Sequence, residues 1–352
     1  MKLERILCDA ISHHASDVHL MVGMPPTMRV NGLLETMAYD KFSSDMTQQL
    51  IYECLVEEQI MHFEQNKELN VSFNLKKVAY FRMNVYYRMG NVEAAIRIIP
   101  IRIPSLEQLG LPLIVKKLTR RPNGLILITG AAGMGKTTTM TAMIDCINRD
   151  DRRSRVITIE DPVEYVHSSI NSVIIQREVG KDTRSFNEGL RQALRQDPNC
   201  ICIGEMRDLE TISIALTAAE TGHLVLATLH SSDTIVALDR IVDVFPQGQQ
   251  EWVRMQLAGV LQGIISQRLL PRIDKTGRAL ALEILITNSA VRHVIRNGDT
   301  NQLNGVILTG GAEGMVGLDR SLATLYRQGI ITYDVAIANA KDFRDFMAQT
   351  RI

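Results

Sequence analysis

Residues Gly130 to Thr137 form a glycine-rich segment with the spacing of a phosphate-binding loop. The segment matches Gly-x-x-x-x-Gly-Lys-Thr, directly after the apolar run Leu125 to Thr129 and directly before a helical run from Thr138 to Ile147. In such a loop the backbone N–H groups surround the phosphates of a nucleotide, the lysine reaches the β and γ phosphates, and the threonine hydroxyl can bind Mg²⁺. The sequence therefore predicts a nucleotide and Mg²⁺ site formed by Gly130, Gly133, Met134, Gly135, Lys136, Thr137 and Thr138, with Thr137 as a metal ligand.

Two glutamates follow apolar runs further along the chain. Glu160 follows Val156 to Ile159, and Glu205 follows Cys200 to Ile203 after one glycine. In an open parallel sheet the carboxyl ends of the strands border the ligand crevice, so both carboxylates are expected beside the phosphate-binding loop. One would position or deprotonate the attacking water, and the other would hold Mg²⁺ directly or through water. Glu160 is the candidate for activating water and Glu205 the candidate Mg²⁺ ligand, but the sequence leaves the reverse assignment open.

Two histidines flank a third apolar run, from Leu224 to Leu229. His230 is followed by Ser-Ser-Asp, residue types that cap helix N-termini, so His230 is also expected at the carboxyl end of the sheet. We predict that His230 senses the γ-phosphate, with helix capping or packing as the alternative. A zinc site is not indicated, because His223 and His230 should point to opposite faces of the strand and no Cys, Asp or Glu completes a ligand set.

The first hundred residues show a different pattern from the rest. They mix short alternating runs with two helical runs and contain no phosphate-binding signature, which is typical of a small α+β domain. The best strand runs from Val78 to Arg88 and returns as a hairpin from Val92 to Ile99. This hairpin holds Arg82 and Arg97 on a sheet, and local sequence alone favours a solvated face for them.

Prolines mark the boundary between the two patterns. Pro100 and Pro104 interrupt both strand and helix, so residues 101–112 are predicted to be a linker. Residues 113–352 then alternate continuous apolar runs with helical ones, which indicates an α/β domain with a largely parallel sheet. From about Gln247 to the end the pattern is mainly helical, interrupted by a glycine-rich stretch from Gly298 to Gly317.

Composition excludes several classes of protein. The 352 residues suit two domains, and 39 Lys and Arg balance 39 Asp and Glu, so no overall field attracts nucleic acid or an anionic membrane. The longest stretch without a charged residue has 14 residues, from Pro122 to Gly135, too few for a membrane span. The five cysteines include no Cys-x-x-Cys pair, which argues against a cysteine zinc site. The N-terminus lacks the apolar region of a signal peptide, so a cytoplasmic protein is expected.

Together the motifs resemble the secretion ATPases of type IV pilus and type II secretion systems, and among them the short pilus retraction ATPases. Residues 15–20 and 25–32 resemble the family's N-terminal PAS-like domain, 159–165 its Asp box, 204–208 its atypical Walker B and 221–230 its His box. Arg82 and Arg97 match arginines that reach the nucleotide at the subunit interface, which reverses the local expectation for them. The resemblance implies an α/β fold with a PAS-like α+β domain (1–100), a linker (101–112) and a RecA-like P-loop ATPase core with a helical C-terminal region (113–352).

The resemblance also implies a function. It indicates a homohexamer in which ATP turnover, with Mg²⁺, moves each N-terminal domain relative to its neighbour's core and so powers pilus retraction and twitching motility. The expected partners are the inner-membrane pilus platform protein and other pilus motor ATPases, at the cytoplasmic face of the inner membrane, and not nucleic acid. The catalytic residues that it implies are Glu160, Glu205, His230, Arg82 and Arg97.

The retraction subfamily is indicated by two absences and one helix. A long extra N-terminal region and a tetracysteine insertion, usual in extension and secretion members, are missing, and residues 290–297 resemble the retraction family's A-I-R-N-L-I-R-E helix. In this helix Arg292 and Arg296 share a face and are predicted to couple the motor to its work, with a solvated face as the alternative.

Two other functions stay open. One is a motor for pilus assembly or type II secretion. The other is a nucleotide-gated accessory subunit without hydrolysis, because Ala131, Ala132 and Met134 replace the Pro or Ala, Thr and Ser that are typical of the family's loop.

Overall fold

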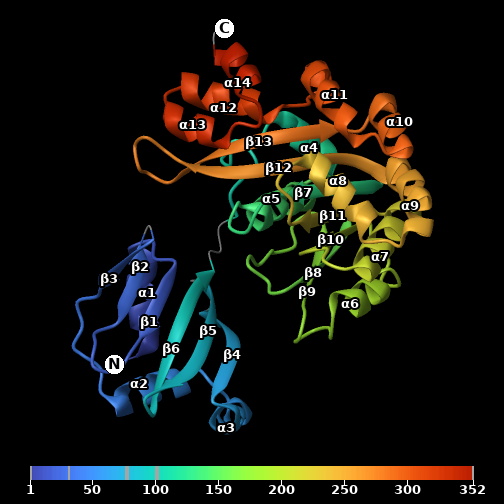
Figure 1. Ribbon diagram of the computed structural model, residues 1–352. Helices are drawn as coiled ribbons and strands as arrows, with labels where there is room; N and C mark the ends of the chain where they lie inside the picture. Colours follow the sequence, from blue (N-terminus) through green and yellow to red (C-terminus); the bar gives the residue numbers. More distant parts are fainter. Residues whose placement is uncertain (1, 31, 76–78, 100–102, 351–352) are drawn as a thin grey trace. The chain divides into compact units, whose positions relative to one another are not determined.

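A computed structural model of the chain describes residues 2–30, 32–75, 79–99 and 103–350 (Figure 1). The chain forms two compact units, Met1–Arg102 and Ile103–Ile352. Four parts of the sequence predictions, Asn31, Val78, Pro100 and residues 101–102, lie outside the described residues.

In the described part of the N-terminal unit, an antiparallel six-stranded sheet has the order β3-β2-β1-β6-β5-β4. Its elements are α1 (Leu3–Ser12), β1 (Asp17–Leu20), β2 (Thr27–Val30), β3 (Leu33–Thr36), α2 (Ser44–Tyr52), α3 (Glu57–Asn66), β4 (Glu68–Leu75), β5 (Ala79–Arg88) and β6 (Asn91–Ile99). Apolar residues of α1 and α2 share one buried cluster with alternate residues of the strands, such as Val18 and Ile96. The alternation follows from the two-residue period of a strand, which sends successive side chains to opposite faces.

The predicted hairpin is formed by β5 and β6. Phe81 and Met83 of β5 are buried, whereas Arg82 between them lies on the other face of the sheet, directly opposite Arg97 of β6. The next strand, β1, places Asp17 opposite Arg97. Cross-strand partners share a face, so these three charged side chains form one row across the sheet.

In the described part of the C-terminal unit, a seven-stranded sheet has the order β13-β12-β7-β11-β10-β8-β9. Its strands are β7 (Gly124–Thr129), β8 (Arg155–Glu160), β9 (Val173–Glu178), β10 (Cys200–Ile203), β11 (Leu224–Leu229), β12 (Leu261–Pro271) and β13 (Arg278–Ile286). Its larger helices are α4 (Leu113–Thr119), α5 (Lys136–Asn148), α6 (Phe186–Ala193), α7 (Leu209–Glu220), α8 (Thr234–Asp243), α9 (Gln247–Val260), α10 (Ser289–Asn297), α11 (Leu303–Thr309), α12 (Leu318–Arg327), α13 (Tyr333–Asn339) and α14 (Phe343–Thr350).

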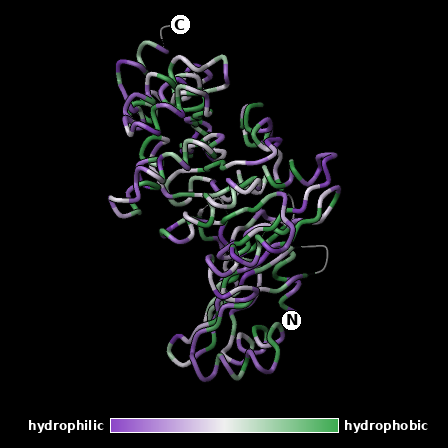
Figure 2. The backbone as a smooth tube through the Cα atoms, turned by 90° about the vertical axis from the view of Figure 1, so that its right-hand side faces the viewer, coloured by the Kyte–Doolittle hydropathy of each residue, from purple (hydrophilic) through white to green (hydrophobic). Residues whose placement is uncertain are grey.

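The four predicted apolar runs are strands of this sheet, as expected. Every residue of β7, β10 and β11 is buried, because α5 and α7 pack against the sheet and the strands carry apolar side chains on both faces. Neighbouring strands from β12 to β9 are parallel, so their carboxyl ends meet at one edge. Figure 2 shows hydrophobic segments running through the interior of each unit and hydrophilic ones in outer loops.

The prediction of a mainly helical pattern after Gln247 is wrong for residues 261–286. Helix α9 ends at Val260 and the chain continues without a break into β12, which pairs with β13 as an antiparallel hairpin. Most residues of β12 and β13 are buried whichever face they lie on, and polar residues interrupt the apolar ones in β12, so neither strand shows a clear two-residue alternation. The glycine-rich stretch from Gly298 to Gly317 also contains a helix, α11.

Two further features bear on the predicted linker and on the C-terminal helix. Leu106 and Leu111, within the segment predicted as a linker, are buried in the core of the C-terminal unit. In α10, Arg292 donates to the carbonyl oxygens of Ala258 and Gly259 in the last turn of α9, whereas Arg296 is exposed. Within the described residues, every helix is too short or too polar to span a bilayer.

Candidate nucleotide-binding site

The phosphate-binding loop connects β7 to α5. Gly130 has φ 149°, and a Cβ added there would meet the carbonyl oxygen of Gln267 at 2.7 Å. Gly135 has φ 81° and caps α5 in a left-handed conformation that side chains other than hydrogen disfavour. Glycine is therefore required at both ends of the loop, where the chain turns from the strand into the helix.

Two cavities adjoin the loop. One, of about 540 Å³, is lined by Met134, Gly135, Thr137 and Thr138 together with Leu109, Leu269, Leu280 and Arg278. Its size and mixed apolar and polar walls suit a nucleotide base and sugar. The other, of about 200 Å³, is lined by Gly133, Lys136, Thr137, Glu160, Glu205 and His230. The structure thus brings the predicted phosphate-binding residues together with both glutamates and the histidine.

Lys136 is held inside the loop. Its Nζ donates to the carbonyl oxygens of Gly130 and Ala131, each at 2.9 Å, and lies 3.3 Å from Nδ1 of His230. The ammonium group has donors only, so Nδ1 of His230 must accept from it. Burial lowers the pKa of Lys136, although the negative charges of Glu205 and Glu164 oppose the shift.

His230 connects the lysine to the second glutamate. Because Nδ1 accepts, the ring proton of a neutral His230 is on Nε2, which lies 3.1 Å from Oε1 of Glu205. The other oxygen of Glu205 accepts a 2.6 Å hydrogen bond from Arg207. Burial alone would raise the pKa of Glu205, but the Arg207 hydrogen bond and the neighbouring positive charges outweigh it and lower the pKa. Glu205 therefore stays ionised, as a Mg²⁺ ligand must.

Glu160 has a different environment. Its side chain is 4% exposed, and its Oε1 accepts hydrogen bonds from Thr158 at 2.6 Å and from Gln176 at 3.0 Å. Burial raises the pKa of Glu160, and these two hydrogen bonds only partly offset it. A carboxylate with a raised pKa accepts a proton more readily, which is the property of a general base.

Met134, one of the departures from the usual loop, has a packing role. Its Sδ accepts from the backbone N–H of Leu269, 3.2 Å away on β12. Sulfur is a weak acceptor, so the bond ties the loop loosely to a neighbouring strand. Nearby, Thr138 Oγ1 lies 3.4 Å from the hydroxyl of Tyr165.

Arg82 and Arg97 belong to the N-terminal unit and line neither cavity. Arg97 Nε lies 3.2 Å from Oδ1 of Asp17, and its side chain is 66% exposed. An exposed pair of this kind contributes at most about 1 kcal/mol, so Arg97 can leave Asp17 for a stronger anion.

Sequence reasoning missed several residues at the site. Glu164 lies within the predicted Asp box and Arg207 within the predicted Walker B segment. Their charge, so close in sequence to Glu160 and Glu205, is the signal that points to them. Gln176 lies on β9, which was not recognised as a strand, and no local pattern marks an isolated glutamine as a partner of Glu160.

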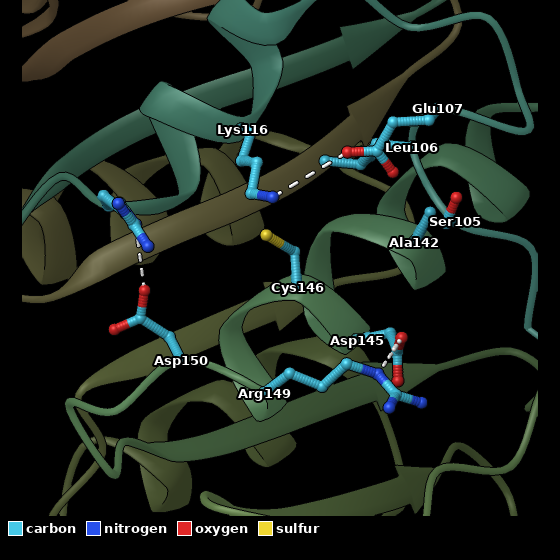
Figure 3. Close-up of a pocket in the computed structure, with 10 residues that line it drawn as sticks. Ser105, Leu106, Glu107, Lys116, Ala142, Asp145, Cys146, Arg149 and Asp150 are labelled. Carbon is cyan, nitrogen blue, oxygen red and sulfur yellow. Dashed lines mark hydrogen bonds and ion pairs between the residues drawn. The ribbon is translucent and has the colours of Figure 1, made fainter.

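A third cavity, of about 240 Å³, lies between α4, the C-terminal half of α5 and residues 105–107 (Figure 3). It shares no lining residue with the two cavities at the loop. Each basic side chain in its wall is paired: Lys116 with Glu107, Arg120 with Asp150, and Arg149 with Asp145. These ion pairs, visible as dashed lines in the figure, leave its walls balanced in charge.

The strand, glycine loop and helix, with carboxylates and a histidine after neighbouring parallel strands, define a P-loop nucleotide-binding protein. Residues 1–314 match the family described as Type II/IV secretion system protein, and the chain belongs to that family.

Relatives cover nearly the whole chain. The type IV pilus retractation ATPase PilT of Pseudomonas aeruginosa is 41% identical over 97% of this chain and 98% of its own length. The twitching motility protein of Neisseria gonorrhoeae is 44% identical over 90% of this chain and 84% of its own length. The type IV pilus ATPase PilU of Pseudomonas aeruginosa is 36% identical over 100% of this chain and 92% of its own length.

Solved structures of related ATPases also match nearly the whole chain. A crystal structure of the pilus retraction motor PilT with bound ADP has a TM-score of 0.91 and 44% identity, and the match covers 99% of each chain. The ATPase DotB of Legionella pneumophila has a TM-score of 0.81 and 29% identity, over 96% of this chain and 95% of its own. The predicted fold class and the resemblance to pilus retraction ATPases are confirmed.

Proposed function

We propose that this chain hydrolyses ATP in a ring of six subunits and uses the energy to withdraw a type IV pilus. The predictions of an ATPase and of a pilus retraction motor are confirmed by relatives with those names that match almost the full length. The ring, the inner-membrane platform protein and other pilus motor ATPases as partners, and a position at the cytoplasmic face of the inner membrane are further parts of the proposal.

The observation that carries the proposal is the connected set Lys136, His230 and Glu205 beside the loop. When ATP binds, the phosphates attract the ammonium of Lys136 away from the two loop carbonyls. His230 then loses its lysine donor, and Nδ1 becomes free to respond to the group that replaces it. Because Nε2 of the same ring contacts Glu205, the presence of a γ-phosphate affects Glu205 through His230.

The residues fit a Mg²⁺ ion. The Thr137 hydroxyl and the ionised Glu205 carboxylate are oxygen donors of the kind that Mg²⁺ prefers, and both line the smaller cavity. Within the described residues no group of three His, Cys, Asp or Glu forms a metal cluster, which suits an ion that its nucleotide's phosphates help to hold. When bound, Mg²⁺ neutralises charge on the β and γ phosphates.

The chain's own residues supply the remaining functions. Glu160 takes the proton of the attacking water, as its raised pKa favours. Arg82 and Arg97 of one subunit stabilise the developing negative charge at the nucleotide of its neighbour. Turnover therefore requires assembly, and it moves the N-terminal unit that carries these arginines relative to the neighbouring core.

A deletion strain tests the function. Complementation with Lys136→Ala should leave filaments on the surface that cannot be withdrawn, whereas the wild type restores twitching. Lys116→Ala, which changes a half-buried lysine outside both loop cavities, is the matched control and should also restore twitching. Loss of filaments in the deletion strain would instead indicate an assembly motor, and a purified wild-type ring without ATP turnover would indicate an accessory subunit.

A further inference from the structure

Gln176 occupies a defined place beside Glu160. It lies on the edge strand β9, which runs parallel to β8 with Gln176 opposite Thr158. Its Nε2 donates to Glu160 Oε1 at 3.0 Å and to the carbonyl oxygen of Tyr165 at 2.8 Å. Its Oε1 accepts from the backbone N–H of His167 at 2.8 Å.

These contacts allow one orientation of the amide. Both N–H groups face acceptors and the oxygen faces a donor. A flipped amide would set its oxygen against a carboxylate and a carbonyl, and its N–H₂ against an N–H. The orientation of the Gln176 amide is therefore fixed by its partners. In turn, the amide can hold the carboxylate of Glu160 and the backbone of Tyr165 and His167 in place.

The hydrogen bonds to Glu160 share one oxygen. Thr158 and Gln176 both donate to Oε1, from β8 itself and from the neighbouring strand. Two donors from different directions hold the plane of the carboxylate and leave Oε2 free of both. The backbone N–H of Glu164 also stabilises the ionised carboxylate. Thr158 lies two residues before Glu160 on the same strand, whereas Gln176 connects the carboxylate to the neighbouring strand β9.

Gln176 also holds the loop that follows Glu160. Tyr165 and His167 belong to the segment between β8 and β9, and the same amide binds the backbone of both. This segment contributes Asp161, Pro162 and Glu164 to the wall of the smaller cavity. One side chain thus fixes the carboxylate and the wall beside it.

We propose that Gln176 is a positioning residue for hydrolysis: it holds Glu160 Oε1 and the 161–172 loop so that Oε2 faces the attacking water. The inference rests on the proposed function of Glu160 as the base. A misdirected base lowers the rate of the chemical step but leaves the binding of ATP intact.

Steady-state hydrolysis by the purified full chain tests the inference. Gln176→Leu removes the side-chain donor that orients Glu160 Oε1, so kcat should fall about 10- to 100-fold while KM for ATP stays within about twofold. The matched control is Gln256→Leu, because the Nε2 of Gln256 likewise donates to a glutamate, Glu220, at 2.7 Å, and Gln256 lines neither loop cavity. The control should keep its kcat.

A double-mutant cycle separates positioning from a merely structural role. If Gln176 acts through Glu160, the double variant Glu160→Gln, Gln176→Leu should be as slow as Glu160→Gln alone. A further drop in kcat, by the factor that Gln176→Leu causes in the wild type, would show an independent role and overturn the inference. Unchanged kcat in Gln176→Leu would overturn it as well.

The other outcomes are also decisive. Normal hydrolysis in Glu160→Gln would refute the base assignment, and with it any action of Gln176 through that base. An impaired Glu160→Gln with a fully active Gln176→Leu would refute only the inference about Gln176. If Gln176→Leu fails to fold, Gln176→Met serves in its place, because it keeps the length of the side chain but removes the donor to Glu160. That variant should fold and lose kcat, and full activity in it would overturn the inference.

Discussion

Lys136 Nζ lies 3.3 Å from His230 Nδ1, so the cation of the phosphate-binding loop donates to the histidine that follows β11. The contact joins two residues that are 94 positions apart, because β7 and β11 are parallel neighbours and both end at the same edge of the sheet. Whatever draws Lys136 toward a phosphate must change the partner of His230. This relationship gives the predicted γ-phosphate sensor a physical basis.

His230→Leu should therefore affect ATP and ADP differently. The variant keeps the loop and Lys136, so its affinity for ADP should match that of the wild type within about twofold. Its response to the γ-phosphate should be lost, with kcat lower by on the order of 10-fold or more. Calorimetric titration with ADP and with a non-hydrolysable ATP analogue measures the difference. Equal losses for both nucleotides would show that His230 only packs the loop.

Exchange of either glutamate for glutamine should separate binding from chemistry. Glu160→Gln removes the proposed base and Glu205→Gln removes the carboxylate of the proposed Mg²⁺ site, so hydrolysis should slow by on the order of 10² or more. ATP binding should survive in both, and only Glu205→Gln should need more Mg²⁺ for half-maximal rate. Near-normal hydrolysis in both variants would refute the pair.

The rate should also depend on pH through Glu160. The ionised form is the base, and burial raises its pKa above the ordinary value, so hydrolysis should fall as pH drops through that raised pKa. Glu205, with a lowered pKa, stays ionised over the same range and contributes no such loss. The pH dependence of kcat in the wild type measures the effect. An acid limb that persists unchanged in the residual activity of Glu160→Gln would assign it to another group.

The sequence predicted the parts of this site that repeat a known chemical pattern. The loop, Lys136 and the strand-end positions of Glu160, Glu205 and His230 followed from residue types and from the rule that parallel strands open at one edge. Gln176 could not be found in this way, because its role depends on the pairing of β9 with β8, a contact between segments that no local pattern encodes. The β12–β13 hairpin was missed for a related reason: most of its residues are buried on both faces of the sheet, so the two-residue alternation of a strand is hidden.

Arg82 and Arg97 should act on the nucleotide of a neighbouring subunit. The double variant Arg82→Ala, Arg97→Ala should be inactive because it lacks the charges that stabilise phosphoryl transfer, a contribution of about 10³ or more. Mixed with Lys136→Ala protein, which has intact arginines, it should regain some turnover, since a mixed ring contains some complete interfaces. Mixed rings that form and yet hydrolyse nothing would rule out action in trans.

Asp17 offers a milder variant of the same experiment. It pairs with Arg97 at 3.2 Å in the row of charged side chains across the sheet. Asp17→Asn should leave both arginines present and change kcat by less than the double alanine variant, as expected for an exposed ion pair of about 1 kcal/mol. An equal loss would mean that the arginines depend on Asp17 for their position.

The two arginines of helix α10 should have different roles, Arg292 in stability and Arg296 in coupling. Arg292 binds two carbonyl oxygens at the end of α9, where a cation also favours the helix dipole, so Arg292→Ala should lower the free energy of unfolding by about 1–2 kcal/mol. Arg292, one of the two arginines predicted to couple the motor to its work, thus has a structural contact as well. Arg296 is exposed, so its guanidinium group is accessible to a partner.

Arg296→Ala is accordingly the variant that tests coupling. It should keep the thermal midpoint and the ATPase rate of the wild type, because it changes an exposed side chain outside both loop cavities. If α10 transmits the motion of the motor to the pilus machinery, cells with this variant should bear filaments that they cannot withdraw. The neighbouring exposed residue His293 provides the control, and His293→Ala should retract normally. Normal retraction with Arg296→Ala would show that Arg296 is a solvated surface residue with no role in coupling.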